Sequence, residues 1–522
     1  MPQIKTLPFK KESIKKIKNF DFGRNWPVVY IIEDGKEAYI GETVSAYGRA
    51  KQHYKKEERK KLNNIHIIYD GEYNKSATLD IESWLIQYMV ADGGFSLQNG
   101  NEGLKNHNYY DRTRYRAKFE TVWERLKIKK KIVGKDLIDL RNSDLFKYSP
   151  YKKLTDDQIS IAKEVTESLK QDESNTYLIK GEPGTGKTVL ATYLFKRMKD
   201  SEEFSDLKIG LVIPQTSLRH SIKKVFKNIK NLKANMVLNP SQVVESGYDV
   251  LIVDEAHRLK RRKNITNYGV FDKNNEKLGL GKGGDQLDWI TISSKSAILL
   301  YDENQSIRPS DVRADKFKNL DSKNYSLESQ IRVKGGEDYL SAINNFFEFR
   351  KIDKKYFPDY DFRICDDIEQ MIEGIKEKNR QEGLSRVLAG YAWPWRTRAG
   401  EADYDIEIDG YKLKWNHTTS NWINTKESIN EVGCIHTVQG YDLNYAGVII
   451  GPEISYNPHK KEFQIDKDNY YDRNGYAGVD DPEELKRYII NIYKVLLTRG
   501  IKGTYVYIVD DDLRKYFNHK LK

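Results

Sequence analysis

The stretch from Tyr177 to Thr188, with the sequence YLIKGEPGTGKT, constrains the fold of this chain more than any other. A short apolar strand leads directly into a glycine-rich turn, and the residues after the turn continue as a helix. Backbone N–H groups of such a turn and of the helix N-terminus can surround phosphates, and only residues without bulky side chains allow that close approach. The stretch therefore predicts a phosphate-binding loop for ATP between a strand and a helix.

The residues of this loop have separate expected tasks. Gly181, Gly184 and Gly186 leave the backbone open to the phosphates. Lys187 is expected to reach the β- and γ-phosphates, and the Thr188 hydroxyl is expected to bind Mg²⁺.

The length of the chain, 522 residues, is too great for one hydrophobic core, so we expect two or three domains. No segment approaches the roughly 20 apolar residues of a membrane-spanning helix, and the N-terminus lacks the apolar core of a signal peptide. We therefore expect a cytoplasmic protein. Two cysteines, Cys365 and Cys434, cannot form a disulfide framework or a zinc site, and we expect both to be reduced core residues.

The net charge of +11 favours a polyanionic partner, because basic side chains near phosphates release counterions on binding. Nucleic acid is the expected partner, with DNA favoured over RNA. The alternative is that the lysines serve only solubility. The 35 tyrosines offer stacking surfaces for bases or, alternatively, core packing.

The first hundred residues predict a small α+β domain. Two short β-rich runs, 27–32 and 37–41, are joined by Asp34-Gly35, a strong hairpin signal. Arg49 and His53 follow in a helical segment, and their spacing of four places them on one face. A further strand is expected over 65–69, and an amphipathic helix over about 76–90 carries Glu82.

Residues 25–105 resemble the GIY-YIG nuclease family. The sequence Val28-Val29-Tyr30 departs from the first signature at two positions, and Tyr39-Ile40-Gly41 matches the second signature fully. The resemblance implies that Tyr30 is the general base with Tyr39 beside it, that Arg49 contacts the scissile phosphate and that His53 assists. It also implies that Glu82 holds a single divalent metal and that Asn99 stabilises the site.

These residue types suit phosphodiester hydrolysis independently of the resemblance. The reaction needs an activated water, a metal ion or arginine to neutralise developing charge, and stabilisation of the leaving oxygen. Each residue alone has a structural alternative: Glu82 as a solvated helix position and Tyr30 as a hairpin aromatic. Whether the domain cleaves nucleic acid or only binds it stays open.

Residues 106–153 form an expected basic helical connector. Its first half, through Leu126, has a helical pattern, and the lysine run 127–131 is either a solvated face or a nucleic-acid contact. Ser149-Pro150 marks the expected end of the connector.

A second catalytic signature follows the apolar run 249–253. This run predicts a strand that delivers Asp254 and Glu255 to its C-terminal end, which is the Walker B arrangement. Asp254 is expected to bind Mg²⁺, and Glu255 is expected to position and polarise the attacking water.

Further segments resemble superfamily-one helicases in the same order. Gln158, upstream of the phosphate loop, is implied to read adenine, or else it is a surface residue of a helix capped by Thr155. Segment 214–218 resembles the motif that touches the nucleic-acid backbone. Gln305, after the predicted strand 296–301, is implied to sense the γ-phosphate.

The remaining motifs of this resemblance lie toward the C-terminus. Segment 327–332 makes Arg332 an implied arginine finger, and Arg499 is an implied second arginine finger supplied across a cleft between lobes. His436 and Gln439 are implied couplers between nucleic acid and nucleotide. The closest resemblance is to a conserved bacterial NTPase family related to the helicase half of Schlafen proteins, which occurs fused behind GIY-YIG nucleases.

Two segments carry their own expectations. We expect the polar, glycine-rich stretch 258–285 to be a mobile surface loop, with a second phosphate cradle at 278–284 as the alternative. The run Tyr391-Ala-Trp-Pro-Trp395 is either a stacking surface or a packed corner.

The expected fold class is α/β, with a small mixed α+β nuclease domain followed by two RecA-like parallel-sheet lobes. The expected domains are the nuclease (1–105), the connector (106–153), the ATP-binding lobe (154–333) and the second lobe (334–522). We expect a metal-dependent nuclease fused to an ATP-driven translocase or helicase that uses Mg²⁺, acting in defence against foreign nucleic acid. One alternative is an ATP-gated switch that controls the nuclease without translocation. Few insertions interrupt the expected lobes, so a strand-separating wedge is not evident. The other alternative is a repair nuclease for branched DNA.

Overall fold

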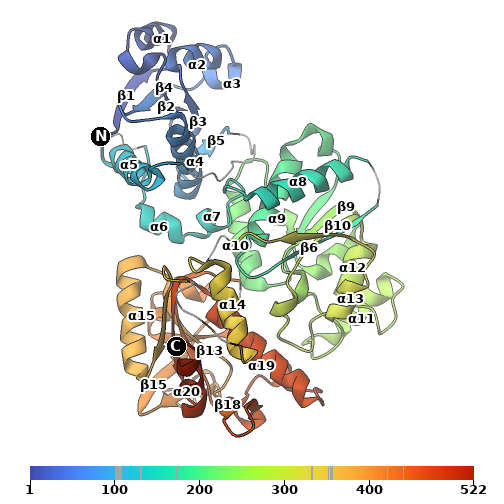
Figure 1. The fold of residues 1–522 in the computed structure, drawn as a ribbon. Coiled ribbons are helices and arrows are strands. Elements are labelled where there is room, and N and C mark those ends of the chain that lie inside the picture. The colour runs from blue at the N-terminus through green and yellow to red at the C-terminus, as the bar shows by residue number, and fades with distance from the viewer. Residues whose placement is uncertain are drawn as a thin grey trace. The chain divides into compact units, whose positions relative to one another are not determined.

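The structure is a computed structural model that describes residues 1–99, 109–129, 132–171, 174–330, 333–350, 352, 357–419, 421–438 and 440–521. Arg332 and Gln439, to which the sequence assigned functions, lie outside the described residues. The chain forms two compact units. Figure 1 shows the course of the chain through its helices and strands. The first unit comprises Met1–Thr166, Thr192–Asp206 and Ser221–Met236, and the second comprises Glu167–Ala191, Leu207–His220 and Val237–Lys522.

The first unit contains a five-stranded sheet in the order β1-β4-β2-β3-β5. Its strands are β1 (Gln3–Pro8), β2 (Val28–Glu33), β3 (Glu37–Thr43), β4 (Asn64–Tyr69) and β5 (Ser96–Leu97). The predicted hairpin is confirmed, because β2 and β3 pair antiparallel from Val28 opposite Thr43 to Glu33 opposite Ala38. β5 runs parallel to β3 and pairs with it only at Glu37 and Ala38, near the start of that strand.

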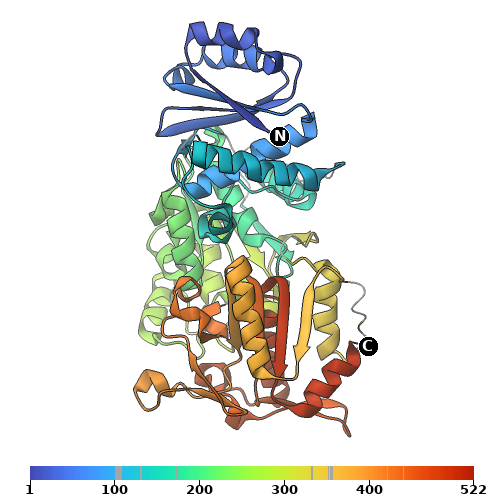
Figure 2. The ribbon, with the colours of Figure 1, turned by 90° about the vertical axis from the view of Figure 1, so that its left-hand side faces the viewer.

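Helices cover both faces of this sheet (Figure 2). On one face, α1 (Lys11–Lys18) and α2 (Ala46–His53) bury Ile17 and Ala50 against the β2 side chains that include Tyr30. On the other face lies α4 (Lys75–Asp92). The remaining helices are α3 (Glu57–Lys60), α5 (Arg112–Glu124), α6 (Leu137–Asn142), α7 (Asp144–Lys147) and α8 (Asp156–Leu169), the last of which continues into the second unit.

The described part of the predicted connector belongs to the first unit, where α5 packs against α4. The aromatic rings of Phe119 and Trp123 on α5 lie 5.3 Å and 5.6 Å from the ring of Tyr88 on α4. Burial of these rings stabilises the packing of α5 on α4, since each large aromatic side chain removes much apolar surface from water.

The second unit contains a parallel sheet in the order β11-β6-β10-β9-β7-β8. Its strands are β6 (Thr176–Gly181), β7 (Ile209–Val212), β8 (Val237–Leu238), β9 (Tyr248–Val253), β10 (Ser294–Tyr301) and β11 (Lys323–Leu327). The helices in this part of the chain are α9 (Lys187–Asp200), α10 (Thr216–Lys227), α11 (Tyr268–Lys277), α12 (Gln286–Ile292) and α13 (Ala314–Lys318). The apolar runs that predicted parallel strands are thus confirmed as buried strands.

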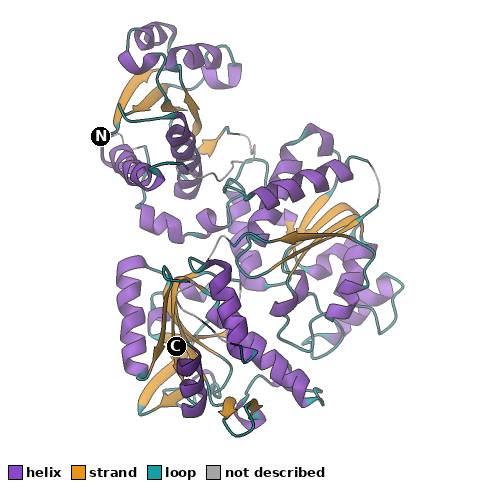
Figure 3. Cartoon of the chain, viewed as in Figure 1, coloured by secondary structure: helices purple, strands orange, loops and turns teal. Residues whose placement is uncertain are grey.

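The second unit also contains a seven-stranded sheet in the order β12-β20-β17-β13-β16-β15-β14, parallel except for β14. Its strands are β12 (Asp361–Cys365), β13 (Ser385–Ala389), β14 (Ile406–Ile408), β15 (Tyr411–Trp415), β16 (Glu431–Cys434), β17 (Leu443–Ile450) and β20 (Gly500–Ile508). One face is covered by α15 (Ile368–Glu382), and the other by α14 (Gly336–Phe347), α19 (Pro482–Leu497) and α20 (Asp511–Lys520) (Figure 3). Short helices α16 (Arg396–Ala399), α17 (Ile435–Val438) and α18 (Arg473–Tyr476) complete this part.

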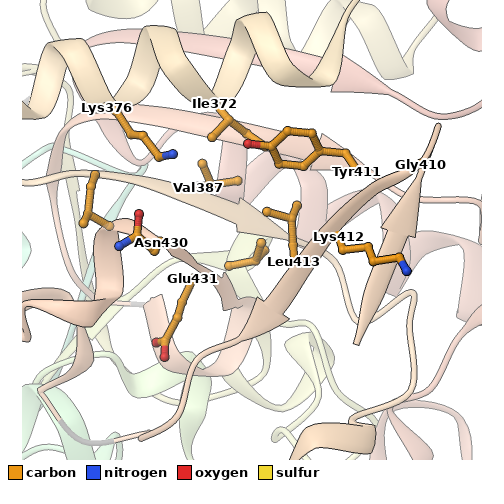
Figure 4. Close-up of a pocket in the computed structure, with 11 residues that line it drawn as sticks. Ile372, Lys376, Val387, Gly410, Tyr411, Lys412, Leu413, Asn430 and Glu431 are labelled. Atoms are coloured by element: carbon orange, nitrogen blue, oxygen red, sulfur yellow. The ribbon is translucent and has the colours of Figure 1, made fainter. Parts of the chain in front are cut away.

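The second unit contains two hairpins that the sequence did not lead us to expect, and the second of them forms a two-stranded sheet of its own. One is the antiparallel pair β14 and β15 at the sheet edge, and the other is β18 (Ile454–Asn457) with β19 (Glu462–Ile465). A pocket of about 300 Å³ lies beside β15, with Ile372, Val387 and Leu413 as its apolar wall and Lys376 and Asn430 at its rim (Figure 4). None of the predicted site residues lines it.

The prediction of a mobile loop over 258–285 is wrong. The stretch contains α11, and Asp285 caps α12 by accepting the N–H groups of Leu287 and Asp288. The glycine-rich part is also held in place, because the Asn275 side chain donates to the carbonyls of Gly281 and Gly284, both at 3.0 Å. These bonds come from residues outside the glycine run, which is why local composition did not reveal them.

Tyr391 and its neighbours form a packed corner. The Tyr391 ring stacks on Trp415 at 5.8 Å with an interplanar angle of 10°, and the rings of Trp393 and Trp395 lie 6.3 Å and 6.4 Å from the same tryptophan. Cys365 and Cys434 are both free and buried, as expected. In the described part of the chain, none of the helices has the length and apolar content that crossing a bilayer requires.

Two candidate active sites

The outer edge of β3 organises the first candidate site. At Ala38 this edge is occupied by the segment after β5, since the Gln98 N–H donates to the Ala38 carbonyl at 2.8 Å. At Ile40 the Asn99 side chain takes over: it accepts the Ile40 N–H at 3.0 Å and donates to the Ile40 carbonyl at 2.7 Å. The Asn99 side chain therefore continues the strand pairing, because its carbonyl and its amino group both hydrogen-bond to the backbone of Ile40.

Glu82 lies at the next position along this edge. The Glu42 backbone N–H faces its carboxylate from β3. Burial, and then the negative charge of Glu42, raise the pKa of Glu82 to about 7, while Lys75 acts in the opposite direction. The Glu42 carboxylate in turn forms an ion pair with Lys75 and accepts the Thr78 hydroxyl at 3.4 Å.

The two carboxylates are a suitable donor set for one divalent cation. Mg²⁺ is commonly bound through one or two carboxylates while it keeps several waters. In the described residues, no cluster of three or more His, Cys, Asp or Glu side chains is arranged to hold a metal. A cation here would therefore depend on Glu82 with Glu42, and its positive charge would offset the repulsion that raises the pKa of Glu82. Glu42 was missed in the sequence, although it directly follows the matched Tyr39-Ile40-Gly41.

Tyr30 reaches this edge from β2. It lies opposite Gly41 in the antiparallel pairing, and a Cβ atom at position 41 would lie 2.2 Å from the Tyr30 hydroxyl oxygen. The glycine is therefore required by the tyrosine ring. Burial and the neighbouring Tyr39 raise the pKa of Tyr30 above its usual value, whereas the Arg49 guanidinium facing its hydroxyl acts to lower it.

His53 contacts Tyr30 directly. Its Nε2 atom lies 2.8 Å from the Tyr30 hydroxyl oxygen, and its Nδ1 atom lies 2.6 Å from a guanidinium nitrogen of Arg59. The ring of Tyr39 lies 4.8 Å from the imidazole. Burial, and then the positive charge of Arg59, lower the pKa of His53 to about 3, so the imidazole is neutral near pH 7.

The structure thus brings five of the predicted residues to one edge of the sheet, namely Tyr30, Tyr39, Arg49, His53 and Glu82. Asn99 binds the backbone beside them. Arg59 was missed in the sequence, where it is one of several basic residues after α2.

The second candidate site is the turn between β6 and α9. Gly184 and Gly186 have φ angles of +92° and +79°, which L side chains rarely adopt. A Cβ atom at Gly181 would lie 2.5 Å from the Thr185 hydroxyl oxygen. The turn therefore needs glycine at all three predicted positions.

Lys187 is buried at the centre of this turn. Its ammonium group donates to the carbonyls of Gly181 and Glu182 at 2.7 Å and 3.0 Å, and it lies 3.2 Å from a carboxylate oxygen of Asp302. The Gln305 amide donates to that same oxygen at 2.7 Å.

Arg499 extends this chain of contacts from the seven-stranded sheet. Its guanidinium donates to the Gln305 side-chain carbonyl at 3.5 Å, to the Tyr441 carbonyl at 3.4 Å and to the Val495 carbonyl at 3.1 Å. Arg499 is only 2% exposed. A continuous polar path therefore joins Arg499 to the phosphate-loop lysine.

Asp254 and Glu255 follow β9 and are buried. Burial, and then the charge of Glu255, raise the pKa of Asp254 well above its usual value, while the Thr188 hydroxyl acts to lower it. Neither carboxylate oxygen of Asp254 makes a well-aligned hydrogen bond. A buried carboxylate without such bonds, beside the Thr188 hydroxyl, is a fitting pair of ligands for Mg²⁺.

Glu255 has an unusual backbone, with a φ angle of +56°. Burial acts to raise its pKa, but His257, whose Nε2 lies 2.9 Å from the carboxylate, acts together with Lys187 and Arg258 to lower it. A left-handed backbone at a non-glycine residue is a strained conformation that functional sites often retain.

Gln330 is a further residue of this site that the sequence did not single out. Its amide donates to the Pro183 carbonyl at 2.6 Å, and a Cβ atom at Gly184 would lie 2.1 Å from its side-chain oxygen. It belongs to segment 327–332, which resembled a helicase motif, so position in that motif was the available signal.

The remaining predicted residues have structural partners of their own. Gln158 is buried, and its side-chain carbonyl accepts the Thr155 N–H at 3.1 Å. His436 lies 2.6 Å from a carboxylate oxygen of Asp472, to which Arg308 donates at 3.3 Å.

Comparison with known proteins gives one family. Residues 174–510 match the family described as Schlafen group 3, DNA/RNA helicase domain. A protein of Saccharomyces cerevisiae, named Uncharacterized protein YPL245W, is 30% identical over 390 residues, which cover 65% of this chain and 83% of the yeast protein.

Two solved structures are similar at low scores. Arterivirus nonstructural protein 10, a helicase in complex with DNA, is 11% identical with a TM-score of 0.31 over 67% of this chain. The match spans 65% of the viral chain, less than two thirds of its length. The Pif1 helicase from Bacteroides in complex with ADP-AlF3 and ssDNA is 10% identical with a TM-score of 0.30, over 68% of this chain and 93% of that one.

The family match extends from β6, through the phosphate loop and Asp254, to the strand that follows Arg499. It covers well over half of the chain. The chain therefore belongs to the Schlafen group 3 DNA/RNA helicase domain family.

Proposed function

We propose that this protein is a metal-dependent nuclease joined to an ATP-hydrolysing nucleic-acid translocase or helicase. The observation that most supports the motor assignment is the polar path from Lys187 through Asp302 and Gln305 to Arg499. Family membership supports the same assignment. A γ-phosphate bound at Lys187 would compete with the carbonyls and the carboxylate that now hold the ammonium group, and this rearrangement would reach Arg499 through Gln305.

In the motor site, Asp254 and Thr188 would hold Mg²⁺, which would neutralise charge on the phosphates. Glu255 would orient and polarise the attacking water. Gln158 would contact adenine, and Arg332 and Arg499 would stabilise charge on the transferred phosphoryl group.

The observation that most supports the nuclease assignment is that four predicted side chains meet at the edge of β3, namely Tyr30, Arg49, His53 and Glu82. The Asn99 side chain pairs with the backbone of the same edge. Tyr30 would accept the proton of the attacking water, Tyr39 would pack beside it, and Arg49 would contact the scissile phosphate. A divalent cation on Glu82 and Glu42 would supply charge neutralisation at the leaving oxygen.

We further propose DNA as the preferred substrate and restriction of foreign nucleic acid as the biological role. The combination of the two sites in one chain, with a net charge of +11, supports this assignment.

A substrate panel tests both activities. ATP hydrolysis should rise when single-stranded, duplex or branched DNA or RNA is added, and Lys187→Ala should abolish it. Cleavage should require a divalent metal and should be lost in Tyr30→Phe and Glu82→Gln while ATP hydrolysis remains. Absence of stimulation by every strand would refute the motor assignment, and cleavage that persists in Glu82→Gln would refute the nuclease assignment.

A further inference from the structure

Arg59, which is outside the predicted set, contacts two aromatic members of the β3-edge site. It lies on α3, six residues after His53. Its guanidinium carbon lies 3.5 Å from the centre of the Tyr39 ring, and one of its terminal nitrogens lies 2.6 Å from His53 Nδ1. Two separate contacts therefore fix the guanidinium against the imidazole.

The direction of the bond between Arg59 and His53 follows from chemistry. A guanidinium has only donors, so Nδ1 of His53 must be the acceptor. A neutral imidazole whose Nδ1 is an acceptor carries its proton on Nε2. The low pKa of His53 agrees with this state, because a protonated ring would direct an N–H group at the guanidinium.

The proton on Nε2 in turn sets the bond to Tyr30. Since Nε2 lies 2.8 Å from the Tyr30 hydroxyl oxygen, the imidazole donates and the phenol oxygen accepts. The Arg49 guanidinium, which also has only donors, faces the same oxygen. With donors on two sides, the hydroxyl hydrogen of Tyr30 must be directed away from both.

We propose that Arg59 is a positioning residue that fixes His53 in its Nε2–H tautomer and thereby makes His53 a hydrogen-bond donor to Tyr30. In this arrangement His53 does not take the phenol proton. Burial opposes ionisation of Tyr30, and the donors on His53 and Arg49 act against that effect. A phenolate formed by loss of the proton to solvent would take a proton from the attacking water and become a phenol again. This catalytic part rests on the proposed nuclease function.

The tautomer can be measured without cleavage. The full-length protein, labelled with ¹⁵N-histidine, should show the His53 ring with a protonated Nε2 and an unprotonated Nδ1 in two-bond ¹H–¹⁵N spectra, with the signal assigned through His53→Gln. Arg59→Met removes the donor but keeps apolar bulk beside Tyr39, and should shift His53 toward the Nδ1–H tautomer. Arg59→Lys restores a donor and should restore the Nε2–H form.

Lys60→Met is the matched control, because Lys60 lies on the same short helix. Its ammonium group lies 3.7 Å from a carboxylate oxygen of Glu57. Lys60→Met should leave the His53 tautomer unchanged. A wild-type His53 that is protonated on Nδ1, or a tautomer that Arg59→Met does not alter in a variant that still unfolds cooperatively, would overturn the proposal.

Cleavage gives the second readout. Arg59→Met should lower kcat by about 10–100-fold with little change in KM, as expected for loss of a group that orients a catalytic side chain, and Arg59→Lys should recover part of it. If no variant or wild-type protein cleaves any substrate while the tautomers behave as described, the nuclease assignment fails and the positioning role stands. If the wild-type protein cleaves and Arg59→Met lowers kcat no more than Lys60→Met does, the positioning role fails while the nuclease assignment stands.

Discussion

The Tyr30 hydroxyl occupies the space that any side chain at position 41 would need. The two residues lie opposite each other on β2 and β3, so neither strand can move away without breaking the hairpin pairing. This close packing explains why a tyrosine on one strand is accompanied by a glycine on the next. It also makes the glycine a sensitive probe of where the tyrosine must sit.

Gly41→Ala tests this packing. The new methyl group would overlap the phenol oxygen, so the ring must shift away from His53, and we expect a loss of about 1–3 kcal/mol in the free energy of unfolding together with loss of cleavage. Thermal unfolding and cleavage rates measure the two effects. Gly71→Ala is the control, because a Cβ atom at Gly71 meets no heavy atom within 4 Å. Normal cleavage by Gly41→Ala would contradict the assigned position of Tyr30.

Between elements, α19 is attached to the end of β17 through one buried carboxyl group. The Tyr493 hydroxyl on α19 accepts the Gly451 N–H at 2.8 Å and donates to Glu453, which is 1% exposed. Burial raises the pKa of Glu453 from 4.5 to about 7, while the hydrogen bond from Tyr493 acts in the opposite direction. The carboxyl group is thus protonated in acid and carries an unfavourable buried charge above neutrality.

The pH dependence of stability follows with a definite sign. Because the folded pKa lies above the unfolded one, the folded state binds the extra proton between pH 4.5 and about 7, and this contribution to stability is lost as the pH rises through that window. The loss corresponds to at most about 3 kcal/mol. Glu453→Gln cannot ionise, so its melting temperature should exceed that of the wild-type protein at pH 8 and match it more closely at pH 5. A difference that does not grow with pH would contradict the assigned state of Glu453.

Elements with a complete local signal were predicted from the sequence, and contacts between elements were not. The Asp34-Gly35 hairpin and the strand, turn and helix around Lys187 each depend on a few adjacent residues, and both were confirmed. Stretch 258–285 was mistaken for a loop because the bonds from Asn275 that hold its glycines are invisible in composition.

The same distinction applies within the candidate sites. Tyr30 and Lys187 could be named because they stand inside motifs. Glu42, Arg59 and Gln330 gain their roles from groups brought to them by folding, namely the Glu82 carboxylate, the His53 imidazole and the Pro183 carbonyl. Sequence spacing alone does not identify the partner that each of these three side chains meets.

On the scale of the whole molecule, the second unit joins its two sheets at a buried arginine. Arg499→Lys keeps the positive charge but cannot donate at once to Gln305, Tyr441 and Val495. We expect ATP hydrolysis to fall by about 10³-fold or more, with nucleotide affinity changed only a few-fold, since an arginine finger acts mainly on the transition state. Steady-state hydrolysis and binding of a fluorescent nucleotide measure the two quantities. The exposed Arg487 lies on α19, which ends two residues before Arg499, and provides the control Arg487→Lys. Equal hydrolysis by both variants would exclude a catalytic role for Arg499.

The last prediction separates a translocating motor from an ATP-gated switch that controls the nuclease. A translocase samples more potential cleavage sites on a longer strand for each binding event, whereas a switch responds only to nucleotide occupancy. On linear duplexes with identical ends and increasing length, we therefore expect ATP to stimulate the initial cleavage rate more strongly as length increases. A non-hydrolysable ATP analogue and Lys187→Ala should both remove this length dependence while basal cleavage continues. Stimulation that is equal at every length, and that the analogue reproduces, would instead identify the chain as a nucleotide-gated nuclease.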